Sequence, residues 1–331
     1  MLLILSNPDD AHVPMVTPKL EARGIDYLCF DPARYPGDAG VSLGFDSSGT
    51  TRCLLEVDGR VHDLSGVTAV WNRRPGKPKA GTAVTDPTHR AFVELVGERC
   101  MTGLWEILDC RWLPARPAQD VRARNKLLQL ALAARLGFLL PDTLVTNRPE
   151  DFLAFRGRTG ASMVSKSLAP LDVKRDGADH VVSYTRPDSR RDVVGYRAIR
   201  HAPVIFQAYV PKQVELRVTI VGRRIFAVEI ASQESRATRH DWRHIDDESV
   251  RYSPHHLPEQ VSARCLRLMD ELGLTYGAVD LILTPQGDYV FLEINPNGQW
   301  AWIEDLTGAP IAAAIADFLA GQGAADTEAA A

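Results

Sequence analysis

Three features are scarce in this sequence, and each scarcity argues against a class of protein. The cysteines number only five, an odd count with no CxxC spacing, which argues against a disulfide framework or a zinc site and favours reduced thiols in the cytoplasm. No apolar run is long enough to cross a membrane, and Leu2–Leu5 is too short for a signal-peptide core. The net charge of -4 lacks the basic surplus that nucleic-acid binding usually requires.

Two catalytic motifs are also missing. No GxSxG element of a serine hydrolase occurs, and no P-loop. The glycine-containing stretch Gly37–Gly49 lacks the GxxxxGK[ST] order, so we expect it to be a loop. Nucleotide binding, if present, must therefore use another architecture.

The length and the hydrophobic pattern indicate several packed units. A chain of 331 residues is too long for one small domain, and 45% apolar with 24% charged residues is typical of a globular protein. A strand at Leu2–Ser6, a helix over about His12–Arg23 and a strand at Ile25–Phe30 predict a βαβ unit with a parallel sheet. A second unit is expected to begin near Ala118.

The strongest chemical signal is a hairpin that carries carboxylates. Two apolar strands, at Gly277–Thr284 and Tyr289–Asn295, flank a four-residue turn. Pairing Thr284 with Tyr289 places Asp280 opposite Glu293, with Asn295 on the same face. Opposed like charges are destabilising and call for a cation, and oxygen ligands favour Mg²⁺. The alternative is a hydrogen-bonded structural Asp280 and an exposed Glu293.

The residues after this strand carry a family resemblance. Asp280, followed by Leu-Glu-Ile-Asn-Pro-Asn-Gly at 292–298, resembles the metal-binding core of ATP-grasp carboxylate–amine ligases. The resemblance implies ATP and two Mg²⁺ ions held by Asp280, Glu293 and Asn295. It also implies an α/β pre-ATP-grasp domain with a parallel sheet over residues 1–117. A two-lobed α+β ATP-grasp fold then follows, with a central lobe at 118–200, a C-terminal lobe at 201–321 and a disordered tail at 322–331.

The same resemblance assigns side chains and backbone groups to the nucleotide. It implies phosphate contacts by Lys126 and Lys166, adenine contacts by the hinge Gln207, Ala208, Tyr209 and Val210, a ribose contact by Glu215, and catalysis by Arg217 with Lys166. Lys174 is expected in a loop over the phosphates. Taken singly, each lysine also fits an ordinary surface position and the hinge an ordinary buried strand.

Three further motifs resemble the graspetide maturases, which make microviridin-type cyclised peptides. The motifs are Trp71-Asn72-Arg73-Arg74-Pro75, Asp241-Trp242-Arg243 and Asn297-Gly298-Gln299-Trp300. The resemblance implies a ribosomal precursor peptide with a leader segment as partner. The residues implied to bind it are Arg73, Arg74, Arg239, Asp241, Arg243, Asn297 and Gln299. The alternative is a solvated Arg73–Arg74 pair beside a core Trp71.

Three functions remain open at this point. The first is a macrocyclase that links Asp or Glu side chains to Ser/Thr hydroxyls or Lys amines. The second is an ATP-grasp ligase that adds an amino acid to a peptide or protein carboxylate. The third is a nucleotide-binding regulator without turnover, which would have no need of Arg217. The sequence leaves the oligomeric state open, with a homodimer as one option.

Overall fold

The computed structural model describes residues 1–159, 162–169, 186–187, 195–235, 238, 242 and 250–322. Several expectations fall outside these ranges: the loop around Lys174, the substrate residues Arg239, Asp241 and Arg243, and the tail beyond Gln322. No helix of the described part is long and apolar enough to span a bilayer.

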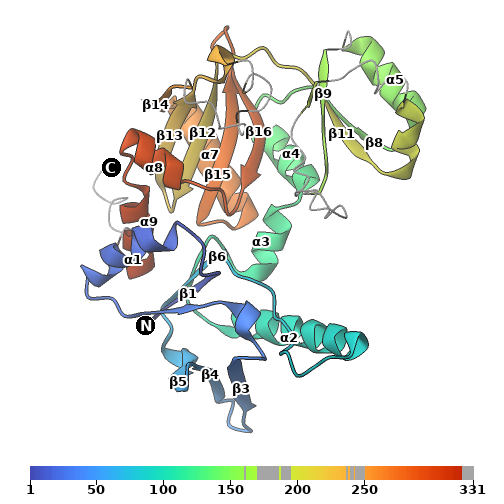
Figure 1. Ribbon diagram of the computed structural model, residues 1–331. Helices are drawn as coiled ribbons and strands as arrows, with labels where there is room; N and C mark the ends of the chain where they lie inside the picture. Colours follow the sequence, from blue (N-terminus) through green and yellow to red (C-terminus); the bar gives the residue numbers. More distant parts are fainter. Residues whose placement is uncertain are drawn as a thin grey trace.

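The N-terminal unit is built on a parallel sheet with strand order β2-β1-β6-β7 (Figure 1). All three pairings in it are parallel, which confirms the predicted fold class for this part of the chain. The elements are β1 (Leu2–Ser6), α1 (Val13–Glu21), β2 (Tyr27–Phe30), β6 (Ala69–Arg74), α2 (Pro87–Ile107) and β7 (Arg111–Leu113).

A three-stranded antiparallel sheet is attached to this unit, and one of its strands corrects an expectation. Strands β4 (Thr51–Val57) and β5 (Arg60–Asp63) form a hairpin, joined by Asp58 and Gly59 at positive φ. The stretch expected to be a loop contains β3 (Ala39–Phe45), which pairs with β4 along its whole length. Its apolar residues pack on the core that β4 shares with α2, so burial overrides the poor strand propensity of its glycines.

The C-terminal lobe is a five-stranded antiparallel sheet with order β14-β13-β12-β15-β16. One face packs on α7, whose apolar stripe runs through Val261, Cys265 and Leu268. The elements are β12 (Val214–Val221), β13 (Arg224–Ile230), β14 (Tyr252–His255), α7 (Glu259–Leu272), β15 (Tyr276–Leu283), β16 (Tyr289–Asn295), α8 (Ala301–Thr307) and α9 (Ile311–Ala320).

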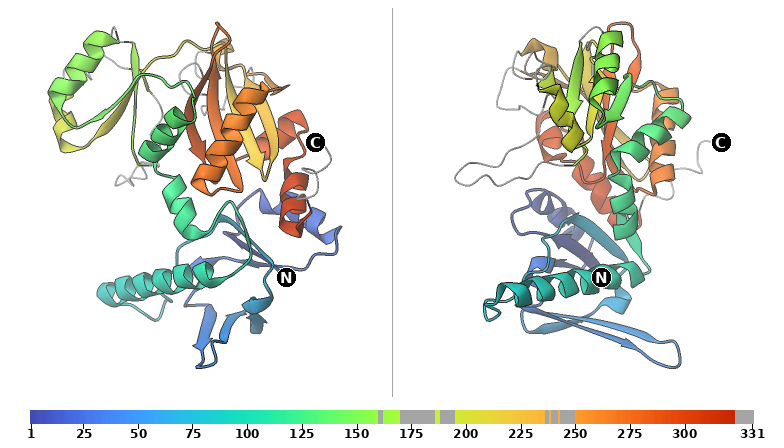
Figure 2. Two further views of the ribbon diagram at one scale, coloured as in Figure 1. Left: turned by 180° about the vertical axis from the view of Figure 1, so that it is seen from behind. Right: turned by 90° about the vertical axis from the view of Figure 1, so that its right-hand side faces the viewer.

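A smaller lobe stands beside the edge of that sheet formed by β16, as Figure 1 and the left view of Figure 2 show. Its strand order is β10-β9-β11-β8. Helices α3 and α4 connect it to the N-terminal unit (Figure 1). The elements are α3 (Pro117–Ala123), α4 (Lys126–Arg135), β8 (Thr143–Thr146), α5 (Pro149–Arg158), β9 (Met163–Lys166), β10 (Arg186–Pro187) and β11 (Val204–Ala208).

The first and last parts of the chain share one hydrophobic core. Residues of β1, α1 and β6 pack together with residues of β12, β13 and α9, and α1 lies against α9 (Figure 1). Trp71 is 2% exposed within this core. The N-terminal unit is therefore anchored to the sheet that carries the candidate site.

Candidate active site

Three charged side chains form one row across the C-terminal sheet. Arg217 on β12 pairs with Asp280 on β15, and Asp280 pairs with Glu293 on β16. Directly paired residues project on the same face of a sheet. This face is opposite the one that α7 covers, because the alternating residues Leu216 and Leu281 pack toward α7.

A β-bulge creates the predicted pairing of the carboxylates. At the turn, Leu283 pairs with Tyr289, one residue out of the predicted register. The register shifts between Asp280 and Leu281, so that Leu292 is the extra residue of β16 and Glu293 falls opposite Asp280. Without the bulge, the leucine would take that place. Bulges commonly re-aim side chains at functional sites in this way.

The two carboxylates contact different cations of the protein. Nη1 of Arg217 lies 3.1 Å from Oδ1 of Asp280, and Nζ of Lys126 lies 3.4 Å from Oε2 of Glu293. Asn295 donates from Nδ2 to Oδ2 of Asp280 at 3.4 Å. The opposition of Asp280 and Glu293 does not by itself require a metal ion, because Arg217 and Lys126 already offset the repulsion between the two carboxylates.

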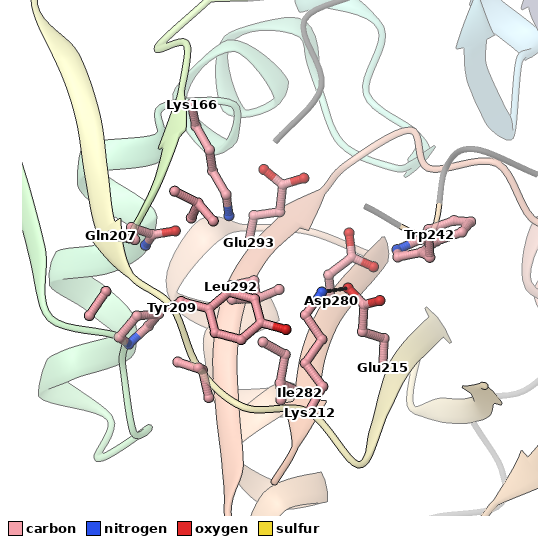
Figure 3. A pocket seen from close by; sticks show the side chains of 14 residues that line it. Lys166, Gln207, Tyr209, Lys212, Glu215, Trp242, Asp280, Ile282, Leu292 and Glu293 are labelled. Carbon is pink, nitrogen blue, oxygen red and sulfur yellow. Dashed lines mark hydrogen bonds and ion pairs between the residues drawn. The ribbon is translucent and has the colours of Figure 1, made fainter. Parts of the chain in front are cut away.

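A pocket of about 600 Å³ opens between the two lobes above this row (Figure 3). It brings together most of the residues expected to bind ATP. Its lining consists of Pro141, Val164, Lys166, Gln207, Ala208, Tyr209, Val210, Lys212, Glu215, Trp242, Asp280, Ile282, Leu292 and Glu293. A neighbouring cavity of about 260 Å³ adds Lys126 and shares Lys166, Gln207 and Glu293 with it.

Lys126 reaches this place because of local helix geometry. Asn125 caps α4 by accepting from the backbone N–H groups of Leu127 and Leu128, both at 3.1 Å. Lys126 is thus the first residue of the helix, and its Nζ also donates to the Ser167 carbonyl at the end of β9 at 3.4 Å. A lysine at a helix N-terminus is a strongly electropositive place, suited to an anion.

The hinge offers fewer backbone donors than its four residues suggest. The Ala208 N–H donates to the Asp142 carbonyl at 2.8 Å, and the Tyr209 N–H donates to the Ser162 carbonyl at 2.9 Å. These two groups fix the crossing between the lobes. The prediction that the hinge binds adenine is therefore restricted to the backbone of Val210 and the carbonyl group of Ala208.

Among the pocket residues that were not assigned from the sequence, Lys212 and Trp242 contact assigned ones. The Lys212 side chain is 6% exposed and forms an ion pair of 2.9 Å with Glu215, so the expected ribose ligand already has a cationic neighbour. The indole of Trp242 lies 4.9 Å from the Arg217 guanidinium carbon, a cation–π contact. Trp242 lies in the motif Asp241-Trp242-Arg243, of which only Asp241 and Arg243 were assigned a role from the sequence. No sequence motif indicates a role for Lys212.

Gln129 on α4 is a third residue that the sequence did not indicate. It is 3% exposed. Its Nε2 donates to the Ile294 carbonyl at 2.8 Å and to the Ala123 carbonyl at 2.7 Å, while its Oε1 accepts from the Ile294 N–H at 3.1 Å. The side-chain amide thus pairs with β16 as another strand would, and it fixes the backbone between Glu293 and Asn295.

We expect Gln129→Leu to lower the free energy of unfolding by about 2–4 kcal/mol, because it leaves the buried N–H and carbonyl of Ile294 unpaired. Urea unfolding followed by circular dichroism measures the change. Gln260→Leu, at an exposed position of α7, is the control and should stay within about 0.5 kcal/mol of the parent. Equal free energies of unfolding for the two variants would show that the Gln129 amide does not stabilise the fold.

Arg73 requires a correction. It was expected to bind the substrate, and it does lie near the end of β6, but its side chain is only 1% exposed. Nε lies 3.3 Å from Oδ2 of Asp10, and Nη1 donates to the Asn297 carbonyl at 3.0 Å. A buried guanidinium held by protein acceptors cannot steer an external peptide, and Arg73 is no longer a substrate candidate.

The other described residues expected to bind the substrate differ in how exposed their side chains are. Arg74 and Gln299 are exposed and keep their predicted role. Asn297 is half-buried and donates from Nδ2 to the Asn72 carbonyl at 3.2 Å, a contact within the protein. None of these described residues lines the pocket between the lobes, so a peptide would have to approach from beside it.

Comparisons with known proteins agree with this fold. The family model described as the MvdD pre-ATP grasp domain matches residues 1–119. The chain is 32% identical to the macrocyclase MdnC of Microcystis aeruginosa MRC, solved with precursor peptide MdnA, with 97% of this chain and 99% of that chain covered and a TM-score of 0.86. A RiPP-associated ATP-grasp ligase of Chryseobacterium gregarium, solved with ADP, a leader and a core peptide, is 29% identical over 97% and 96% of the two chains, with a TM-score of 0.89.

The fold and these relatives define an ATP-grasp ligase. Within that class, the likeness to MdnC extends over both whole chains, and the chain belongs to the family of RiPP ATP-grasp macrocyclases. Curated relatives include a probable alpha-L-glutamate ligase of Klebsiella pneumoniae (strain 342), 27% identical over 58% of this chain. The chain spans only 61% of that relative's length.

Proposed function

We propose that the protein is an ATP-dependent peptide macrocyclase. It activates an Asp or Glu side chain of a ribosomal precursor peptide as an acyl phosphate and joins it to a Ser/Thr hydroxyl or a Lys amine, which gives an ω-ester or ω-amide link. The observation that carries the proposal is the pocket on which Lys166, Asp280 and Glu293 converge, directly beside the apolar hinge. The macrocyclase relatives indicate a peptide as the substrate.

The nucleotide would lie along the pocket with its adenine at the hinge. The Val210 N–H and the Ala208 carbonyl would pair with the adenine edge, while Ile282 and Leu292 supply apolar walls. The ribose would then lie near Glu215 and Lys212, whose ion pair of 2.9 Å fixes both side chains. This direction brings the phosphates to Lys126, Lys166 and the charged row of the sheet.

The donors near the phosphates fit magnesium. Asp280, Glu293 and Asn295 offer two carboxylates and an amide on one face of adjacent strands, and hard oxygen donors suit Mg²⁺ completed by water and phosphate oxygens. Bound there, Mg²⁺ would neutralise charge on the phosphates and on the oxygens of the transferred group. We propose that these three residues would together hold two ions. The ion pairs of Asp280 with Arg217 and of Glu293 with Lys126 would then be exchanged for contacts to metal and phosphate.

The chemistry has two steps. A carboxylate oxygen of the peptide attacks the γ-phosphorus, the bond to ADP breaks, and an acyl phosphate forms. The hydroxyl or amine then attacks the carbonyl carbon, loses its proton and expels phosphate. Arg217 and Lys166 would stabilise the charge on the phosphoryl oxygens, for which a planar guanidinium is well suited. Trp242 covers Arg217 and would keep water from that side of the reactive intermediate.

A second candidate function follows from the curated relatives. Their name indicates a ligase that adds glutamate, and such an enzyme would use the same activation step with a free amino acid as nucleophile. The two functions therefore differ only in which molecule supplies the attacking group. A regulator that binds a nucleotide without turnover is a third outcome, disfavoured because Arg217 pairs with Asp280 at the phosphate end of the pocket.

One incubation separates these possibilities. The protein is mixed with ATP, Mg²⁺ and the short peptides encoded next to its gene, with and without free glutamate, and the products are weighed by mass spectrometry. We expect ADP release together with a loss of one water mass per link in a single peptide. A gain of glutamate residues would establish the second function. Nucleotide binding without ADP release would refute both ligase proposals.

A further inference from the structure

A buried cluster of Asp10, His12 and Arg73 lies outside the nucleotide pocket and has no role in the chemistry above. Asp10 and His12 precede α1, and Arg73 belongs to β6. Their exposed fractions are 8%, 6% and 2%. Burial of an arginine is costly unless its charge is paired. We refer to Asp10, His12 and Arg73 as the seam cluster.

The protonation state of the cluster follows from its neighbours. Two groups that can only donate contact the His12 ring: the Trp300 backbone N–H lies 3.3 Å from Nε2, and Nη2 of Arg73 lies 3.1 Å from Nε2 and 3.0 Å from Nδ1. With both donors at Nε2, we assign no proton to that nitrogen. Nδ1 therefore carries the proton and donates to Oδ1 of Asp10 at 2.8 Å. Burial and the Arg73 charge lower the pKa of His12, against the effect of Asp10. Burial alone would raise the pKa of Asp10, but the His12 hydrogen bonds and Arg73 lower it to about 2. The cluster is thus Asp⁻, neutral His and Arg⁺.

The hydrogen-bond partners of the cluster in the C-terminal lobe belong to one loop. Arg73 donates from Nη1 to the carbonyls of Asn297 and Gly298, at 3.0 and 3.3 Å. His12 accepts from the Trp300 N–H, and the two rings meet edge to face with centroids 5.0 Å apart. Tyr276 adds a hydrogen bond of 2.8 Å to the Gly298 carbonyl. These contacts hold the loop from Pro296 to Trp300 at both of its ends.

The loop is pressed onto the sheet directly after the proposed metal ligands. A Cβ atom on Gly298 would lie 2.4 Å from Cβ of Ala278, so only glycine permits this approach. The Gly298 N–H donates to the Asn295 carbonyl at 3.2 Å, and Ala278 is the cross-strand partner of Asn295. The position of the Asn295 backbone therefore depends on the loop, and the position of the loop depends on the cluster.

We propose that Asp10, His12 and Arg73 are positioning residues that hold the loop 296–300 in place and thereby orient Asn295 toward the metal. The inference rests on the proposed metal site. Ligands must be held by supporting contacts to bind an ion tightly, and loss of such support commonly weakens metal affinity. The N-terminal unit would thus contribute to metal binding without touching metal or nucleotide.

A second contact between the same two units provides a matched control. Arg23, just after α1, donates from Nε to Oδ1 of Asp317 on α9 at 3.1 Å. This pair joins the N-terminal unit to the C-terminal lobe as the seam cluster does, but it has no contact with the loop. A general loosening of the interface should therefore affect Arg23 and Arg73 variants alike, whereas a positioning role affects only the cluster.

The experiment measures Mn²⁺ binding in the presence of ADP by the electron paramagnetic resonance signal of free Mn²⁺, which requires no turnover and no peptide. We expect Arg73→Gln and His12→Leu to raise the Mn²⁺ dissociation constant by about tenfold. His12→Gln should recover most of the affinity, because an amide can accept from Trp300 and donate to Asp10. Arg23→Gln should leave the constant unchanged within about twofold, even if its melting temperature falls.

The outcomes separate this inference from the proposed site. Glu293→Gln, measured in parallel, must weaken Mn²⁺ binding if the metal site is correctly placed. If it does and neither Arg73→Gln nor His12→Leu has an effect, the positioning role is wrong and the site stands. A similar loss in Arg23→Gln would also overturn the positioning role. If Arg73→Gln fails to fold, the comparison of His12→Leu with His12→Gln decides.

Discussion

Glu293→Gln should reduce ADP formation by at least about a hundredfold while the protein keeps its fold. A neutral amide replaces a carboxylate that would hold Mg²⁺, and metal charge stabilisation is worth several kcal/mol. The Glu293 side chain is 19% exposed and forms an ion pair of 3.4 Å with Lys126. Steady-state ADP release, with circular dichroism as the check on folding, measures the effect.

The matched control removes the same charge from the same hairpin. Asp288 lies in the exposed turn between β15 and β16. The substitution Asp288→Asn should change ADP formation less than about twofold, because surface substitutions usually have small effects. Full activity of Glu293→Gln, or an equal loss in Asp288→Asn, would contradict the metal assignment.

Arg217→Met should lower kcat for ADP formation by about a hundredfold or more, the range found when a preorganised group that stabilises transition-state charge is removed. Arg217 is 5% exposed and lies between Asp280 and Trp242, so its guanidinium is held in place before any substrate arrives. We expect kcat and kcat/KM for ATP to fall together, which indicates an interaction made only in the transition state. Arg217→Lys should be intermediate, since it keeps the charge but loses the planar fork.

Arg223→Met is the control for Arg217→Met, because it removes an arginine that follows the same strand, β12. Arg223 is exposed and pairs with Asp270 at 2.8 Å, an ion pair of the kind that contributes little. Its kinetics should match those of the parent. If Arg217→Met raised only the KM for ATP and left kcat unchanged, Arg217 would bind the ground state and the proposed role in phosphoryl transfer would be wrong.

The parts of the fold that local patterns determine were predictable from the sequence. The parallel sheet follows from alternating strand and helix segments. Helix α7 ends where its apolar stripe meets Gly273, which takes the left-handed conformation with φ of 67°. The opposition of Asp280 and Glu293 was also predicted, although through a register that the structure reaches only by a bulge at Leu292. Simple counting along two strands does not reveal such a bulge.

The features that escaped prediction depend on contacts between distant segments. Arg73 was expected to face a substrate because its motif resembles that of the graspetide maturases, but its partners Asp10 and Asn297 come from the two ends of the chain. Gln129 pairs with β16 through a residue separation of 165, and no spacing rule connects them. Lys212 differs, since it is three residues from Glu215, yet a lysine in a hinge loop normally suggests a solvated side chain.

The predicted nucleotide residues were brought together because they lie at strand ends and at a helix start. Lys126 begins α4, Lys166 ends β9, and Val210 follows β11. Side chains at such ends project into the space between packed elements, where ligands bind. The family resemblance therefore selected residues that line one pocket, and their contact with a nucleotide stays a prediction. The cations that pair with each acid became clear only from the structure.

The transfer of oxygen from the peptide to phosphate tests the central claim most directly. A precursor peptide that the enzyme cyclises is prepared with its Asp and Glu side-chain carboxylates labelled with ¹⁸O, and the phosphate released with ADP is analysed by mass spectrometry. If the pocket at Asp280 and Glu293 forms an acyl phosphate, each link transfers one labelled oxygen to inorganic phosphate and leaves the other in the new carbonyl. Unlabelled phosphate, or label that appears in AMP, would contradict the account.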